Sequence, residues 1–249
     1  MRDSRFHMTR DNSDRINELF AAAARDLTPA SARHAVCVLS APVSHDPEVS
    51  MQCASVLSDA ERQRADRFAA ESDKARFIQR RAFRRFCGAA VLESSRPLSH
   101  VVFGETRRGR PYLSELPEFQ FSFSSCRFGF LGAWSSTHRI VLDLEDQTRN
   151  LEAVELAQRY FSGAEAQAVK GAADLARRRT FFQLWSLKEA ALKSIGEGLP
   201  FGLDAFEFEL TPNLRVVQAP RDHGGPEQFD AHLIEEADYC AALVIQSAV

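Results

Sequence analysis

The order of helical and extended segments is the feature that most constrains the fold of this chain. Segments with helical spacing of apolar residues precede shorter alternating segments, and this order occurs twice along the 249 residues. The longest helices are expected at 73–93 and 178–195, each followed by strands that look antiparallel. The pattern predicts an α+β fold of two similar halves that meet near Thr137, although no sequence repeat proves a duplication.

Shorter segments complete the expected organisation. Ser72 is the expected cap of the helix at 73–93. Further helices are expected at 14–27, 57–70, 151–160 and 164–170, and strands at 34–41, 101–103, 119–124, 127–134, 140–145, 205–210, 214–218, 231–233 and 239–245. We divide the chain into a peripheral extension (1–33), an N-terminal half (34–137) and a C-terminal half (138–249).

Composition excludes several classes of protein. The net charge of −3 gives no general reason to expect nucleic-acid binding. A basic stretch runs from Arg62 to Arg85, but its phenylalanines lie at core spacing, which disfavours a nucleic-acid-binding module. No apolar run approaches the roughly 20 residues of a membrane span. The five cysteines are scattered without CxxC spacing, so we expect reduced thiols in a cytoplasmic protein.

Two acidic residues lie two positions apart near the end of an expected strand. Asp143 and Glu145 therefore leave the same face of that strand, whereas Leu142 and Leu144 point into a core. Paired hard oxygen ligands suit a magnesium ion that keeps water or phosphate in its other positions. By itself the pattern is weak, because the end of an amphipathic strand often carries acids.

The expected helix at 178–195 carries a second polar pattern. Trp185, Glu189 and Lys193 lie four residues apart and share one helical face. A surface ion pair between Glu189 and Lys193 is the ordinary explanation of this spacing. The tryptophan argues instead for a partly buried face, where a carboxylate needs a reason to be present.

Together these patterns resemble the surfactin-type (Sfp-like) branch of the 4′-phosphopantetheinyl transferase superfamily. Its signature G-x-D-x-E, followed about forty residues later by W-x-x-K-E-x-x-x-K, corresponds to Asp143, Glu145 and residues 185–193. The likeness extends over roughly residues 57–245. It includes further motifs at 109–111, 159–165, 196–199 and 203–206.

The resemblance implies a fold, a reaction and its partners. The fold would be a pseudo-dimer of two α/β halves with the active site in the cleft between them. The enzyme would be a cytoplasmic monomer that uses Mg²⁺ to transfer 4′-phosphopantetheine from coenzyme A to a serine of an apo carrier protein and releases 3′,5′-ADP. The carrier could serve fatty acid, polyketide or nonribosomal peptide synthesis.

The resemblance also implies roles for individual residues. Asp143, Glu145 and Glu189 would be the magnesium ligands, with Glu189 also acting as the base toward the serine. Lys193 would contact the phosphates around the scissile bond. The residues expected to contact coenzyme A are Arg64, Arg76, Arg110, Ser124, Ser125, Arg127 and Lys188.

The sequence departs from the family at the centre of this pocket. Ser125 replaces the family histidine, and Arg127 and Val141 replace glycines. In an extended strand Arg127 would share a face with Ser125, so its guanidinium could replace the missing charge. These departures leave open an alternative, a catalytically weakened homologue that binds coenzyme A or the carrier without efficient transfer. Retention of all three carboxylates favours the enzyme.

Overall fold

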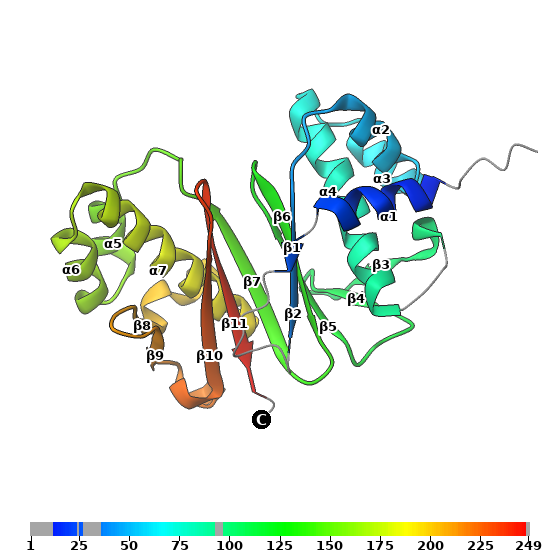
Figure 1. The fold of residues 1–249 in the computed structure, drawn as a ribbon. Helices are drawn as coiled ribbons and strands as arrows, with labels where there is room; N and C mark the ends of the chain where they lie inside the picture. The colour runs from blue at the N-terminus through cyan, green and yellow to red at the C-terminus, as the bar shows by residue number, and fades with distance from the viewer. Residues whose placement is uncertain (1–11, 24, 27–35, 93–96, 248–249) are drawn as a thin grey trace, which may run out of the picture. The chain divides into compact units, whose positions relative to one another are not determined.

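A computed structural model describes residues 12–23, 25–26, 36–92 and 97–247 (Figure 1). The chain forms two compact units, and each is described by itself. Unit 1 comprises Met1–Ala24 and Val43–Phe103, and unit 2 comprises Arg25–Pro42 and Gly104–Val249. Thr137 lies in the turn between two strands of unit 2, and the division of the chain into similar halves at this point stays a prediction.

Unit 1 is a helical unit built around one long helix. Helix α4 (Glu71–Leu92) packs against α1 (Asn12–Ala23), α2 (Pro47–Ala54) and α3 (Asp59–Ala65). A short 3₁₀ helix, Leu98–His100, follows α4. Of the apolar stripe expected on α4, Phe77, Ala82 and Ala89 are buried and Phe86 is half-buried. The rings of Phe20 and Phe83 meet edge to face 5.5 Å apart. The N-terminal helix is thus part of the core of this unit.

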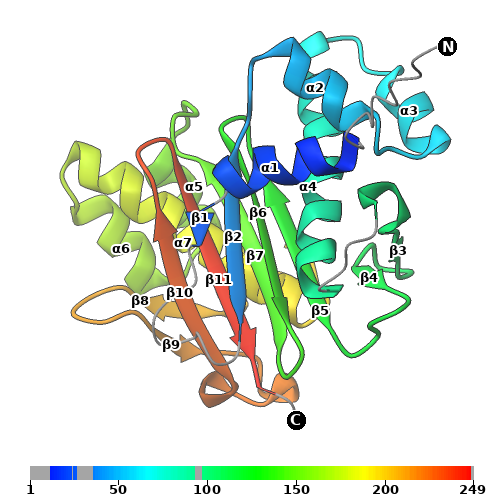
Figure 2. The same cartoon turned by 45° about the vertical axis from the view of Figure 1, so that its right-hand side comes forward.

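The two larger sheets lie in unit 2 and are antiparallel, as Figure 2 shows best. The four-stranded sheet has the order β1-β2-β6-β5, and the three-stranded sheet has the order β10-β11-β7. Their bounds are β1 Arg25–Asp26, β2 Cys37–Pro42, β5 Gln120–Ser125, β6 Gly129–Ser135, β7 Arg139–Asp146, β10 Phe229–Glu235 and β11 Tyr239–Gln246. Val38, Leu131, Leu142 and Leu243 belong to the core that the two sheets share.

The other face of the three-stranded sheet is covered by helices (Figure 1). Helix α7 (Asp174–Ser194) packs on β7 and β11, and α5 (Ala153–Tyr160) and α6 (Gly163–Gly171) pack on α7. The smaller strand pairs are β3 (Phe103–Glu105) with β4 (Pro111–Leu113) and β8 (Glu207–Glu209) with β9 (Arg215–Gln218). Helix α7 ends at a glycine: Gly196 has φ +79°, and the amide of Glu197 donates to the carbonyl of Leu192.

The structure confirms the α+β class and corrects several expected elements. The helix expected at 14–27 ends at Ala23, because Arg25 and Asp26 pair with β2 instead. Ser72 does not cap α4, which already begins at Glu71. The strand expected at 101–103 begins only at Phe103. Helix α2, with Asp46 as its cap, was not expected at all. The first residues of the strand expected at 34–41 lie outside the described residues.

Candidate metal and phosphate site

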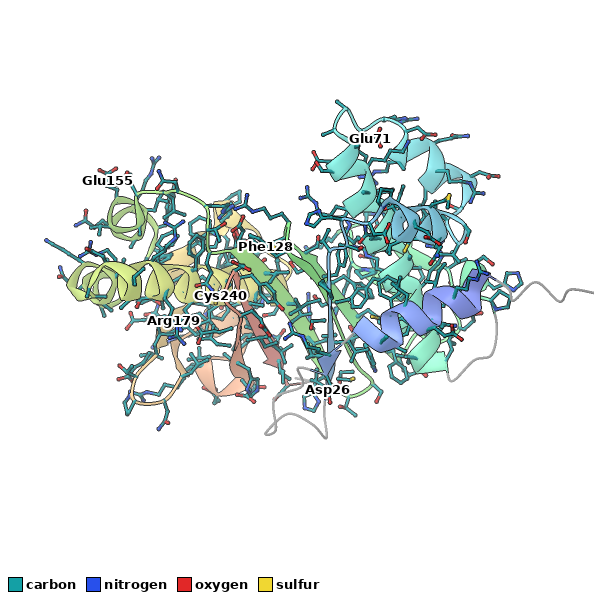
Figure 3. All side chains as sticks on the ribbon, turned by 45° about the horizontal axis from the view of Figure 1, so that its top comes forward. Asp26, Glu71, Phe128, Glu155, Arg179 and Cys240 are labelled. Carbon is teal, nitrogen blue, oxygen red and sulfur yellow. The ribbon has the colours of Figure 1, made fainter. Side chains whose placement is uncertain are left out.

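Strand β7 separates polar and apolar side chains as its sequence predicts. Leu142 and Leu144 are buried in the core between the sheets. Asp143 and Glu145 leave the opposite face, where Asp143 is 5% exposed. In register, Ala242 of β11 lies beside Asp143, and Cys240, which is labelled in Figure 3, lies beside Glu145. The strand therefore holds both carboxylates on the face that α7 covers.

Helix α7 brings a carboxylate and an ammonium group to the same place. The Lys193 Nζ lies 2.7 Å from the Asp143 Oδ1 and 3.0 Å from the Glu189 Oε2, so one cation bridges the two acids. The ion pair that the i,i+4 spacing of Glu189 and Lys193 predicts is therefore present, but it belongs to a larger cluster and is not an isolated surface pair. Asp143 and Glu189 are 46 residues apart in the sequence, yet both carboxylates contact the same ammonium group.

The cluster is electrostatically crowded. Burial raises the pKa of Asp143, and the Glu189 charge adds to this effect, whereas the Lys193 ammonium opposes it. Burial, followed by the Asp143 charge, raises the pKa of Glu145 to about 7, although Arg149 lies 2.7 Å from its Oε2 and opposes the rise. Three carboxylates, the Lys193 ammonium and the Arg149 guanidinium therefore share a partly buried place in which full ionisation of the acids is disfavoured.

The donor set fits a hard divalent cation. The Asp143 Oδ2 is buried and has no hydrogen-bond partner, an orphaned acceptor of the kind that a metal ion satisfies. Carboxylate oxygens are the ligands that Mg²⁺ prefers. Within the described ranges, however, no group of three or more His, Cys, Asp or Glu side chains is arranged as a ready metal site. The physical reason is that Lys193 lies between Asp143 and Glu189 and Arg149 pairs with Glu145.

Lys188 lies beside Glu189 in sequence, but its side chain leaves α7 in a different direction and meets different partners. Its side chain is 0% exposed, and its Nζ lies 2.6 Å from the Glu165 Oε2 and donates to the carbonyls of Leu203 and Phe206. Burial lowers the pKa of Lys188, and Glu165 opposes this effect. All three ammonium hydrogens have partners inside unit 2. The contact with coenzyme A expected for Lys188 does not fit this geometry.

Comparison with known proteins identifies the family. A family model described as the 4′-phosphopantetheinyl transferase superfamily matches residues 139–244, which include the carboxylates, Lys188 and Lys193. The 4′-phosphopantetheinyl transferase HetI of Nostoc sp. is 31% identical over 170 residues, which cover 67% of this chain and 70% of that protein. The chain belongs to the 4′-phosphopantetheinyl transferase superfamily.

Two Bacillus relatives place the chain in the Sfp-like branch of this superfamily. The 4′-phosphopantetheinyl transferase Sfp of Bacillus subtilis is 29% identical over 126 residues, which cover 50% of this chain and 55% of that protein. A 4′-phosphopantetheinyl transferase of Bacillus pumilus is 28% identical over 143 residues, which cover 57% of this chain and 59% of that protein. The chain thus spans less than two thirds of the length of these two relatives.

Ser125, which departs from the family motif, is the last residue of β5, and Arg127, which also departs from it, lies in the turn that follows. Ser124 and Ser125 are half-buried at the last two positions of the strand. Arg127 is not in an extended strand but in the turn before β6, so the argument that placed it on the face of Ser125 does not hold. The Arg127 Nε lies 2.9 Å from the Asp146 Oδ2, and its guanidinium also donates to Thr148.

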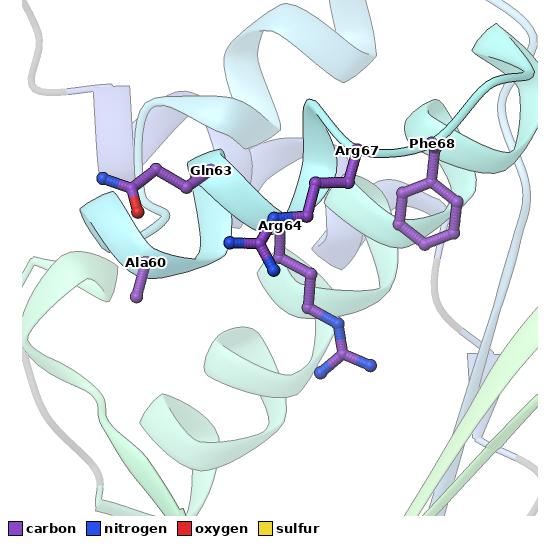
Figure 4. A pocket seen from close by; sticks show the side chains of 5 residues that line it. All are labelled: Ala60, Gln63, Arg64, Arg67 and Phe68. Carbon is purple, nitrogen blue, oxygen red and sulfur yellow. The ribbon is translucent and has the colours of Figure 1, made fainter.

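The two arginines expected to bind phosphate from unit 1 have different surroundings. Arg64 is exposed and lines a hollow with Ala60, Gln63, Arg67 and Phe68 (Figure 4). Its guanidinium lies over the ring of Phe77, 5.5 Å from the centroid. Arg76 does not line this hollow, and its Nη2 lies 2.8 Å from the Asp73 Oδ1. Arg64 is therefore the more available of the two for an anion.

The sequence argument missed the residue that holds Lys188 in place. Glu165 is 2% exposed and forms a capping box with Ser162 at the start of α6. Its Oε1 accepts from the amide of Phe208, 2.9 Å away. Ser162 and Glu165 were recognised only as family motif residues, although the S-x-x-E spacing is itself a capping signal. Glu165 thus connects α6, α7 and β8.

Proposed function

We propose that this protein transfers 4′-phosphopantetheine from coenzyme A to a serine of an apo carrier protein in a Mg²⁺-dependent reaction that releases 3′,5′-ADP. Membership of the superfamily and the names of the relatives support the reaction class. The observation that carries the proposal is the Lys193 ammonium between Asp143 and Glu189. One cationic group therefore contacts two of the three expected metal ligands.

Each residue of the cluster has a chemical part in this proposal. Asp143, Glu145 and Glu189 would hold the magnesium ion, which when bound would stabilise charge on the phosphate oxygens. Lys193 is half-exposed and could exchange its carboxylate partners for a phosphate oxygen of the donor. Glu189, the carboxylate on α7, would accept the proton of the incoming serine. Positioning and charge stabilisation dominate phosphoryl transfer, so a rigid strand and helix suit the task.

Unit 1 has a smaller part in the proposal. Arg64, in the hollow of Figure 4, would contact a phosphate of coenzyme A. The coenzyme A pocket would also be lined by Ser124, Ser125 and Arg127. Arg127 would leave Asp146 when coenzyme A binds. We also propose that the protein acts as a cytoplasmic monomer. No described helix is long and apolar enough to cross a membrane.

Mass spectrometry tests the proposal. A panel of apo carrier proteins is incubated with the protein, coenzyme A and magnesium, and a mass gain of one phosphopantetheine arm on any carrier is the expected result. Glu189→Gln should lower the rate by at least about two orders of magnitude, because a base and a ligand are lost together. Glu155→Gln removes an equivalent charge from the exposed face of α5 and should leave the rate unchanged.

The catalytically weakened homologue predicts a different outcome. Such a protein would bind coenzyme A but leave every carrier unmodified, with and without magnesium. Near-normal turnover of Glu189→Gln would instead keep the transferase but remove the role assigned to this carboxylate. The two results therefore reject different parts of the proposal.

A further inference from the structure

The turn after β7 places a guanidinium group beside the third carboxylate of the cluster. Lys193 contacts Asp143 and Glu189. Arg149 contacts the remaining acid, and its Nη2 lies 2.7 Å from the Glu145 Oε2. Arg149 comes four residues after Glu145, beyond the end of the strand. The resemblance to the family assigns no role to this arginine, so its contacts have to show what it does.

The backbone of this turn is held from two sides. From α7, the Arg178 guanidinium donates to the carbonyls of Gln147 and Arg149. From the loop between β10 and β11, the carbonyl of Asp238 accepts from the Gln147 amide, 3.1 Å away, and the carbonyl of Glu236 accepts from the Gln147 side chain, 3.0 Å away. The main chain of Arg149 is therefore fixed, and only its side chain can change partner.

The side chain of Arg149 is held less firmly than its main chain. It is 51% exposed, whereas the side chain of Glu145 is 17% exposed. Its guanidinium also lies over the ring of Phe182, 5.7 Å from the centroid. An ion pair with one half-exposed partner contributes little stability, because water competes for the arginine. Arg149 can thus leave at small cost, but the more deeply buried Glu145 then needs another cation.

We propose that Arg149 is a latch: it pairs with Glu145 in the absence of a metal ion and competes with the metal ion for this carboxylate. The latch rests on the proposed function, in which Glu145 is a metal ligand. Glu145 can join Asp143 and Glu189 as a ligand only after it exchanges Arg149 for the metal. The fixed main chain brings the arginine back to the same place when the metal leaves. Arg149 therefore lowers the affinity for the metal and keeps Glu145 paired before the metal binds.

A supporting role of Arg149 would have the opposite effect. A carboxylate that binds a metal is often oriented by a hydrogen bond from a neighbouring side chain, and loss of that neighbour typically costs about ten- to a hundredfold in metal affinity. An orienting side chain has to be locked by its own packing, whereas Arg149 is half-exposed. The direction in which metal affinity changes therefore decides between the two roles.

Electron paramagnetic resonance of Mn²⁺ tests the latch without coenzyme A or a carrier protein. Mn²⁺ prefers the same carboxylate ligands as Mg²⁺, and its signal measures the free ion. Arg149→Met, which keeps an apolar stem beside Phe182, should bind Mn²⁺ about two- to fivefold more tightly than wild type, because a competing ion pair of modest strength is lost. Arg149→Lys keeps the cation and should bind like wild type. Arg221→Met, which removes an exposed arginine elsewhere in unit 2, is the control and should also bind like wild type.

A double-mutant cycle shows whether the effect acts through Glu145. Glu145→Gln should itself weaken Mn²⁺ binding, and in this background Arg149→Met should give no further gain. An equal gain in both backgrounds would mean that Arg149 acts only by charge repulsion, and would overturn the latch. Weaker or unchanged Mn²⁺ binding by Arg149→Met would overturn it as well. Circular dichroism shows whether each variant is folded.

The outcomes separate the latch from the proposed function. Tighter Mn²⁺ binding by Arg149→Met, in a protein that modifies no carrier, would keep the latch and reject the transferase. A protein that modifies carriers, but whose Mn²⁺ affinity does not rise in Arg149→Met, would keep the transferase and reject the latch. If neither wild type nor Arg149→Met binds Mn²⁺, the carboxylates do not hold a metal by themselves and the latch is wrong.

Discussion

The buried ion pair between Glu165 and Lys188 allows a quantitative prediction about stability. Both side chains are essentially unexposed, at 2% and 0%, and their charged atoms are 2.6 Å apart. Replacement of Lys188 by Met leaves the Glu165 carboxylate without its cation and removes the donor from the carbonyls of Leu203 and Phe206. Loss of one partner of a buried pair costs about 3–5 kcal/mol of unfolding free energy.

A loss of this size can be measured as a change in the melting temperature of unit 2. For a protein of this size each kcal/mol lowers Tm by about 2–4 °C, so Lys188→Met should lower Tm by roughly 6–20 °C. Both tryptophans, Trp134 and Trp185, belong to unit 2, so their fluorescence follows the unfolding of that unit. Lys170→Met, which removes an exposed lysine from α6, is the matched control and should change Tm little.

A second variant separates the charge from the packing. In Glu165→Gln, Lys188→Met the unpaired carboxylate is gone, while the glutamine can still accept from the amide of Phe208. This double variant should recover part of the loss, because breaking a buried pair costs more than replacing both of its members. Our reasoning would be refuted if Lys188→Met lost less than about 1 kcal/mol, or if the double variant were less stable than Lys188→Met.

Two further predictions concern Glu61 and Gly196. Burial raises the pKa of Glu61, but its hydrogen bonds with Arg85 and the Ser58 amide outweigh burial, so the pKa is lowered. The stabilisation that Glu61 provides is therefore complete above the ordinary pKa near 4.3 and is lost as the pH falls through the folded-state pKa. Denaturant unfolding at pH 6 and pH 3.5 should therefore show a smaller acid loss in Glu61→Gln than in wild type, and equal losses would contradict this. Gly196→Ala and Gly109→Ala both place alanine at a left-handed φ, which costs about 1–2 kcal/mol. Only Gly196→Ala also displaces the Arg108 side chain, so it should lower Tm more than Gly109→Ala does, and equal Tm values for the two variants would oppose this.

The sequence predicted much of unit 2 because its elements have strong local patterns. Alternation along β7 identified which residues face the core and which carry charge, and the structure agrees at Leu142 and Asp143. Helix α2 has only eight residues, and Cys53 is the only one of them that is buried, so its sequence shows no helical stripe. Strand β1 has two residues and exists only because β2 pairs with it, a tertiary effect that local patterns do not contain.

The different surroundings of Lys188 and Glu189 show what can and what cannot be predicted from the sequence. Successive helical residues point about 100° apart, so Lys188 follows Leu184 and Leu192 into the core while Glu189 follows Trp185 and Lys193. The spacing alone could have predicted this burial. The partner of Lys188 could not be predicted in this way, because Glu165 lies 23 positions earlier and on another helix.

The two faces of β7 restrict how the length of the chain can vary. Because successive side chains alternate, insertion or deletion of one residue inside Arg139–Asp146 would turn the leucines toward α7 and the acids toward the core between the sheets. A single such event would remove the cation ligands and bury their charges at the same time. Viable insertions should therefore fall in the turns before Arg139 and after Asp146, and a library of one-residue insertions screened for folded protein would map that boundary.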